Sequence, residues 1–156
     1  MELPPLKLKV GLVPETCWFK SLRKQMRRSQ WDSLRKKVYA DQDNVCRVCG
    51  ADRKLNCHEV WEYDEERYVQ RLIGFQAVCN MCHHVTHFGK AQDLAAQGYL
   101  DLGAVIEHFT KVNGVGRQVF ERHKTEAFRT WWKRSKHEWR SDLGEWASLI
   151  SERTAS

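Results

Sequence analysis

Four cysteines of this sequence stand in two pairs with the spacing of metal ligands. Each pair is a Cys-x-x-Cys, formed by Cys46 with Cys49 and by Cys79 with Cys82. Four thiolates in two such pairs are the ligand set of a tetrahedral zinc site, and a site closed by four sulfur ligands leaves no open position for catalysis. The sequence therefore predicts a structural Zn²⁺ ion that joins the two ends of the intervening segment.

Histidines within and just after this segment predict a second metal site. His83 and His87 are four residues apart, so both imidazoles lie on one face of a helix. His84 with His87, three apart, is the less favoured pair. His58 stands between the two cysteine pairs, and folding its segment onto the helix would bring His58, His83 and His87 together. We expect a divalent ion there: Mg²⁺, Mn²⁺, Ni²⁺ or Zn²⁺.

The elements that would position these ligands follow in the order strand, strand, helix. Residues 55–63 and 68–78 contain the β-branched and aromatic side chains that favour strands. Acidic residues 64–66 predict the turn between them, and Gly74 predicts a bulge or break in the second strand. A helix is expected to begin at His83. The expected fold class is therefore α+β.

This arrangement resembles the zinc-bearing HNH endonucleases, which have a ββα-metal core. The resemblance rests on the two cysteine pairs, on the order of elements, and on the run Cys82-His83-x3-His87. It covers about residues 29–90. It implies a ββα-metal (HNH) core with a four-cysteine zinc staple, and an enzyme that cleaves DNA phosphodiester bonds with a divalent ion on the three histidines.

The resemblance implies roles for two neighbouring strand residues, in either of two registers. In the family a metal ligand precedes a general base, and apolar residues follow. Aligning residues 60–61 with the apolar positions makes His58 a ligand and Glu59 the catalytic base. The other register makes Cys57 the ligand and His58 the catalytic base. We prefer the first register because it keeps the apolar pattern.

The sequence also departs from the family. A carboxylate stands in the base position of the preferred register, where imidazole is usual, and Gly74 stands near the position of the family's central Asn. These departures suggest an alternative function: a catalytically inactive HNH-like zinc module that binds nucleic acid or protein.

Positive charge is concentrated near the N-terminus. The formal net charge is +6, and residues 1–45 carry ten Lys or Arg against five Asp or Glu. A run of one sign can be an arm that contacts phosphates or a solvated helix face. On the first interpretation the partner is double-stranded DNA, and the contacts are made by Arg23, Lys24, Arg27, Arg28, Arg35, Lys36 and Lys37.

Three segments are expected along the chain. Residues 1–45 would form the basic N-terminal arm, with a helix capped by Ser29. Residues 46–90 would form the zinc-bound core, and residues 91–156 a C-terminal helical extension packed on it. In that extension we expect a helix from Asp101 to Asn113 and a longer one over residues 119–140, with its tryptophans in the core.

Cysteine usage and hydropathy predict the setting. Four of the six cysteines are in Cys-x-x-Cys pairs, and we see no signal sequence. No apolar run approaches the roughly 20 residues that span a bilayer. We therefore expect a cytoplasmic protein that binds no membrane. The sequence does not predict the oligomeric state.

Overall fold

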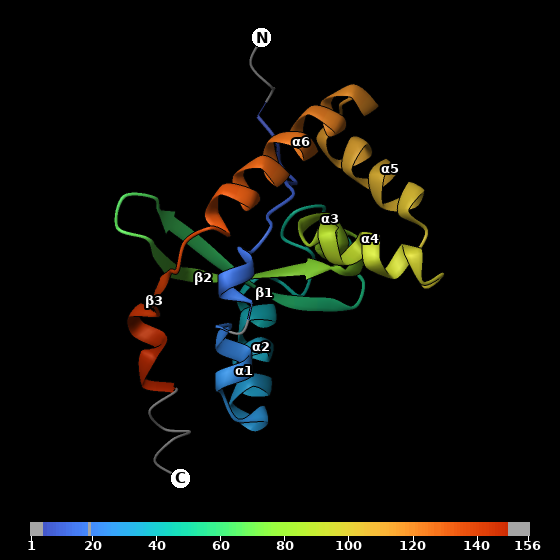
Figure 1. The fold of residues 1–156 in the computed structure, drawn as a ribbon. Coiled ribbons are helices and arrows are strands. Elements are labelled where there is room, and N and C mark those ends of the chain that lie inside the picture. Colours follow the sequence, from blue (N-terminus) through green and yellow to red (C-terminus); the bar gives the residue numbers. More distant parts are fainter. Residues whose placement is uncertain (1–4, 19, 150–156) are drawn as a thin grey trace.

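The computed structural model describes residues 5–18 and 20–149, which form a three-stranded sheet with helices on both of its faces (Figure 1). The prediction of an α+β fold is confirmed. The strands are β1 (Leu55–Asp64), β2 (Val69–Cys79) and β3 (Arg140–Asp142). The helices are α1 (Leu22–Gln25), α2 (Arg28–Asp41), α3 (Asn80–Thr86), α4 (Phe88–Ala96), α5 (Leu102–Asn113) and α6 (Arg117–Arg134), with the short 3-10 turns η1 (Glu15–Cys17) and η2 (Gly144–Trp146).

The hairpin of β1 and β2 is the centre of the fold. Its strands pair antiparallel from Leu55 opposite Cys79 to Asp64 opposite Val69. The Asp64 carboxylate accepts hydrogen bonds from the backbone N–H groups of the next turn, which closes the hairpin. The register shifts between Val60 and Trp61, which leaves Ile73 without a partner beside Gly74. The irregularity predicted at Gly74 is therefore a β-bulge.

Two hydrophobic clusters pack against this hairpin. The larger one contains Val85 of α3, Phe109 of α5 and Phe120 of α6, each fully buried. The smaller one joins Leu22 of α1 and Trp31 of α2 to the sheet. In Figure 1, α1 and α2 lie on one side of the hairpin and α3 to α6 lie on the other. Consecutive residues of β1 therefore face different sets of helices.

The N-terminal segment before α1 is packed between the last helices and the core. Leu8 and Val10 are buried. The side chain of Asn113 accepts hydrogen bonds from the backbone N–H groups of Lys7 and Leu8, and the His123 imidazole accepts one from Val10. The N-terminal segment is thus held to α5 and α6, more than 100 positions away in the sequence.

Two helix boundaries differ from the sequence prediction. Helix α2 begins at Arg28, so Ser29 lies inside it and not at its cap. Helix α3 begins at Asn80, so Cys82 and His83 occupy the same helix. In contrast, α5 has the predicted cap, with the Asp101 side chain accepting the N–H of Ala104 at 3.3 Å.

The prediction of a helix over residues 119–140 is wrong at its end. Helix α6 stops at Arg134, and β3 adds to the sheet parallel to β2. The reason is the position of Trp139, which is 2% exposed and packs edge-on against Tyr63 and Tyr68 of the hairpin. The sequence prediction placed the tryptophans of this helix in the core. Trp139 is buried, but beyond the helix and against the sheet, and Trp132 of α6 is 57% exposed.

No helix within the described part of the chain is long and apolar enough to cross a membrane.

Candidate metal centres

The first cysteine pair lies in a tight turn before β1. Gly50 follows the pair with a φ of +77°, a conformation that glycine adopts without steric cost, and its N–H donates to the Cys46 carbonyl at 2.8 Å. The N–H of Cys49 points at the Cys46 sulfur at 3.5 Å. The backbone N–H of Arg47 donates to Ala77 of β2, so the turn is attached to the sheet.

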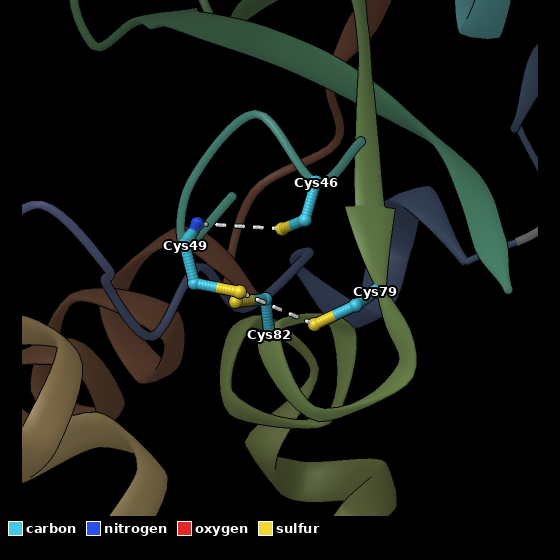
Figure 2. Close-up of side chains that lie close together, drawn as sticks. All are labelled: Cys46, Cys49, Cys79 and Cys82. Atoms are coloured by element: carbon cyan, nitrogen blue, oxygen red, sulfur yellow. Dashed lines mark hydrogen bonds between the residues drawn. The ribbon is translucent and has the colours of Figure 1, made fainter. Parts of the chain in front are cut away.

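The second pair lies where β2 passes into α3. Cys79 is the last residue of β2, and Cys82 lies in the first turn of α3. The four thiol sulfurs converge and lie within 4.8 Å of one another (Figure 2). The Cys49 and Cys79 sulfurs are 3.7 Å apart, which matches the roughly 3.8 Å between ligands of a tetrahedral zinc ion with bonds of about 2.3 Å. The four-cysteine group could hold a zinc ion.

The environment of the sulfurs favours a bound cation. Burial raises the pKa of Cys46, but hydrogen bonds from backbone N–H groups outweigh it and bring the pKa to about 7. Burial also raises the pKa of Cys82, and the charges of the other thiolates raise it further. Four thiolates packed this closely repel one another, and a divalent cation among them removes that repulsion.

A fifth side chain reaches this group from α5. The Nε2 atom of His108 lies 3.2 Å from the Cys82 sulfur. Helix α5 packs closely on α3. Sequence reasoning missed His108 because it belongs to no motif: it is a single histidine, 26 residues after Cys82. The amphipathic pattern of α5 was the only signal, and that pattern does not say which helix α5 contacts.

The three predicted histidines form a second group. His58 comes from β1, His83 from α3 and His87 from the C-cap of α3. Their ring centroids are 5.8, 5.1 and 4.6 Å apart, and one nitrogen of each ring lies within 4.8 Å of the other two. Among the described residues His84 is outside this group. The three imidazoles could hold a metal ion.

The histidines of this group are held in the neutral form that binds metals. Burial, followed by the charge of neighbouring histidines, lowers the pKa of His58 to about 4 and that of His83 to about 3. Burial also lowers the pKa of His87. At neutral pH each ring therefore offers a lone pair without first losing a proton.

Glu59 is held apart from the three imidazoles. Its carboxylate accepts the N–H of Leu22, the first residue of α1, at 2.8 Å. Burial raises the pKa of Glu59, and backbone hydrogen bonds from Leu22 and Arg23 partly oppose that effect. Among the described residues, no Glu59 oxygen joins the group of His58. Because Glu59 follows His58 in a regular strand, its side chain points to the other face of the sheet.

Cys57 shares the face of Glu59. It packs against the cluster of α1 and α2, and burial, followed by the Glu59 charge, raises its pKa to about 12. The structure therefore brings neither Glu59 nor Cys57 to the histidine group. Of the strand residues that the two registers invoke, His58 alone lies there.

The predicted arm is partly neutralised by its own helix. Arg35 pairs with Asp32 at 3.0 Å and Lys37 with Asp41 at 2.9 Å, while Arg28 lies 3.9 Å from Asp32. Such ion pairs are compatible both with a solvated helix face and with a surface that contacts phosphates. The other arm residues, Arg23, Lys24, Arg27 and Lys36, are exposed. Contact of the arm with nucleic acid stays a prediction.

His58 also borders a groove of about 820 Å³. The groove runs between β1, residues 6–13 and α6. Of the three histidines, His58 is the one that borders it.

Comparison with known proteins adds no relative: no protein-family model, curated protein or solved structure matches this chain.

Proposed function

We propose that this protein is a metal-dependent phosphodiesterase of the HNH type that cleaves DNA. The observation that carries the proposal is the convergence of His58 from β1 with His83 and His87 from α3. The four-cysteine group joins the ends of the same hairpin. The resemblance to the ββα-metal core leads one to expect this arrangement: two strands and a helix around three imidazoles, joined at their ends by four cysteines.

The two groups suit different ions. The four cysteines would hold a structural zinc, and the histidines a second divalent ion. Such an ion supplies a Lewis acid for a phosphoryl oxygen and lowers the pKa of bound water. Three neutral imidazoles suit Zn²⁺ or Ni²⁺ better than Mg²⁺ or Mn²⁺, which prefer oxygen ligands. Polar neighbours of the ligands, among them His108 beside Cys82, would orient them.

His58 is the residue whose role decides the mechanism. As a ligand it would complete a triad with His83 and His87. As the general base it would take a proton from the attacking water while the other two histidines hold the ion. Its place beside both rings and on the groove suits either role. Glu59, engaged by the N–H of Leu22, is the weaker candidate for the base.

Metal content and plasmid cleavage, measured on the same samples, test this function. We expect nicking or linearisation with one or more of Mn²⁺, Ni²⁺, Zn²⁺ and Mg²⁺. His87→Ala should abolish cleavage and lower the metal content from two ions per chain to one. His84→Ala is the matched control, because His84 lies on the same helix outside the group. Cleavage that survives both His83→Ala and His87→Ala would contradict the proposal.

His58→Ala separates the two roles of His58. If His58 is a ligand, the variant should lose the second ion together with cleavage. If His58 is the base, the variant should keep two ions per chain and still fail to cleave.

One observation favours a second function, a non-catalytic metal-stabilised module that binds nucleic acid or protein. With Glu59 hydrogen-bonded to Leu22, no carboxylate of the described residues joins the histidine group. That function predicts a protein with two bound ions that retards duplex DNA on a gel, or binds a protein partner, and leaves the plasmid intact with every ion.

A further inference from the structure

A basic pocket lies beside the four-cysteine group. Its volume is about 490 Å³, and it is bounded by the first cysteine turn, by the start of α3 and by α5. Four cationic side chains line it, and no Asp or Glu of the described residues does. The cations are Lys7, Arg53, Lys54 and Lys111.

These four cations have no acidic partner among the residues that the structure describes. All four are exposed. Other basic residues do have one: Lys37 pairs with Asp41, and Arg117 with Glu121. Four like charges around one hollow repel each other, and an anion in the hollow would relieve that repulsion.

The charge of the neighbouring thiolates does not account for all four cations. Four thiolates with one Zn²⁺ carry a net charge of −2, and Cys49 and Cys79 border the pocket. Four cations exceed that charge by two. The pocket therefore stays positive when the zinc site is complete.

The pocket and the histidine group lie along the same line of contact between β1 and α3. The Asn56 side chain donates to Asn80 Oδ1 at 2.7 Å, and Asn80 borders the pocket. Asn56 precedes His58 by two residues, about 6.6 Å along a strand. Asn80 precedes His83 by three residues, about 4.5 Å along a helix. One strand of duplex DNA carries a phosphate about every 3.4 Å of its axis, so one strand can reach both places.

We propose that this pocket binds a backbone phosphate of the nucleic acid strand whose neighbouring phosphodiester lies at the histidine group. The Asn80 amide nitrogen adds a donor, because its Oδ1 is already engaged by Asn56. None of the seven predicted arm residues lines the pocket. It is therefore a second contact, separate from the arm. The inference rests on the proposed function in taking nucleic acid as the ligand and in placing the neighbouring phosphodiester at the histidine group.

Duplex binding of charge-neutralised variants is the first test. The test variant is Lys54→Gln with Lys111→Gln. The control is Lys90→Gln with Lys133→Gln, which removes the same charge from two exposed lysines outside the pocket. We expect the test variant to bind labelled duplex roughly tenfold more weakly at low salt, with a salt slope lower by about one. The control should bind nearly as the wild type does. Equal weakening of both variants, or of neither, would overturn the proposal.

Lysine acetylation of the wild-type protein is the second test and needs no variant to fold. The purified protein is acetylated alone, in the presence of duplex DNA, or in the presence of inorganic phosphate. The modified lysines are then identified by mass spectrometry. DNA should protect Lys7, Lys54 and Lys111 more than Lys90 and Lys133. Protection by phosphate but not by DNA would mean that the pocket takes a free anion, which contradicts the proposal.

Cleavage measured on the same DNA keeps the two proposals apart. If DNA protects the pocket lysines but is not cleaved, the proposed nuclease activity is contradicted and the proposed phosphate contact is supported. If DNA is cleaved but does not protect the pocket lysines, the phosphate contact is contradicted and the nuclease activity is supported.

Discussion

The Glu59 carboxylate accepts the backbone N–H of Leu22 at 2.8 Å, which ties β1 to the first residue of α1. A half-buried side chain that caps a helix in this way stabilises the fold, and its role is separate from the chemistry at His58. We expect Glu59→Ala to lower the free energy of unfolding by about 1 kcal/mol. Glu59→Gln, which keeps an acceptor oxygen, should cost less. Urea titration of the metal-loaded protein measures both changes.

The same pair of variants tests whether Glu59 is the general base. We expect Glu59→Gln to cleave plasmid at nearly the wild-type rate. A loss of cleavage by a hundredfold or more with an unchanged free energy of unfolding, the scale of general-base removal, would return Glu59 to that role.

The four-cysteine group should be required for folding and the histidine group should not. Cys82→Ser breaks a closed zinc site whose apparent binding energy is of order 10 kcal/mol in small domains. We expect it to lose zinc and cooperative thermal unfolding together, as measured by metal analysis and circular dichroism. His87→Ala should keep one zinc and a cooperative transition. A Cys82→Ser chain that melts as the wild type does would contradict a structural role for the zinc.

His108 should hold the Cys82 thiolate in place. Its Nε2 atom lies 3.2 Å from the sulfur, at the distance of a hydrogen bond to a metal ligand. Loss of such a partner typically weakens metal binding about 10- to 100-fold. We expect His108→Phe to release zinc to a chromophoric chelator correspondingly faster, and His84→Ala to release it at the wild-type rate. Equal release from all three proteins would show that the contact has no effect on the metal.

His123 should make the fold sensitive to acid. Its Nε2 atom accepts the N–H of Val10 at 2.9 Å, which only the neutral imidazole can do. Burial, followed by the charge of Lys9, lowers the pKa of His123 below its usual value near 6.5. The unfolded chain therefore binds a proton that the folded chain does not, so this contribution to stability is lost as the pH falls below about 6.5.

The measurement is urea unfolding at pH 7.5 and 5.5. We expect the wild type to lose more stability between these values than His123→Gln, whose amide oxygen accepts without titrating. The difference between the two proteins isolates His123 from the other histidines. An identical loss in both would contradict the assignment.

Local spacing indicated the two cysteine pairs and the histidine pair of the candidate metal groups. Two residues between cysteines place two sulfurs on one turn, and the four-residue step from His83 to His87 places two rings on one helical face. The β-branched and aromatic side chains likewise indicated the hairpin, and helical periodicity indicated α5. These patterns depend on backbone geometry over a few residues, so they can be read without knowing the rest of the fold.

Tertiary structure decided what lies on each side of those elements. Whether Glu59 serves the histidine group depended on α1 docking on the opposite face of β1. Trp139 ended α6 because the hairpin offered its indole a buried site. His108 and the four cations of the basic pocket met only because α5, the first cysteine turn and the N-terminal segment pack together. Such contacts join residues that are distant in sequence. Which residues meet depends on how whole helix and sheet faces pack together, and a short sequence pattern does not contain that information.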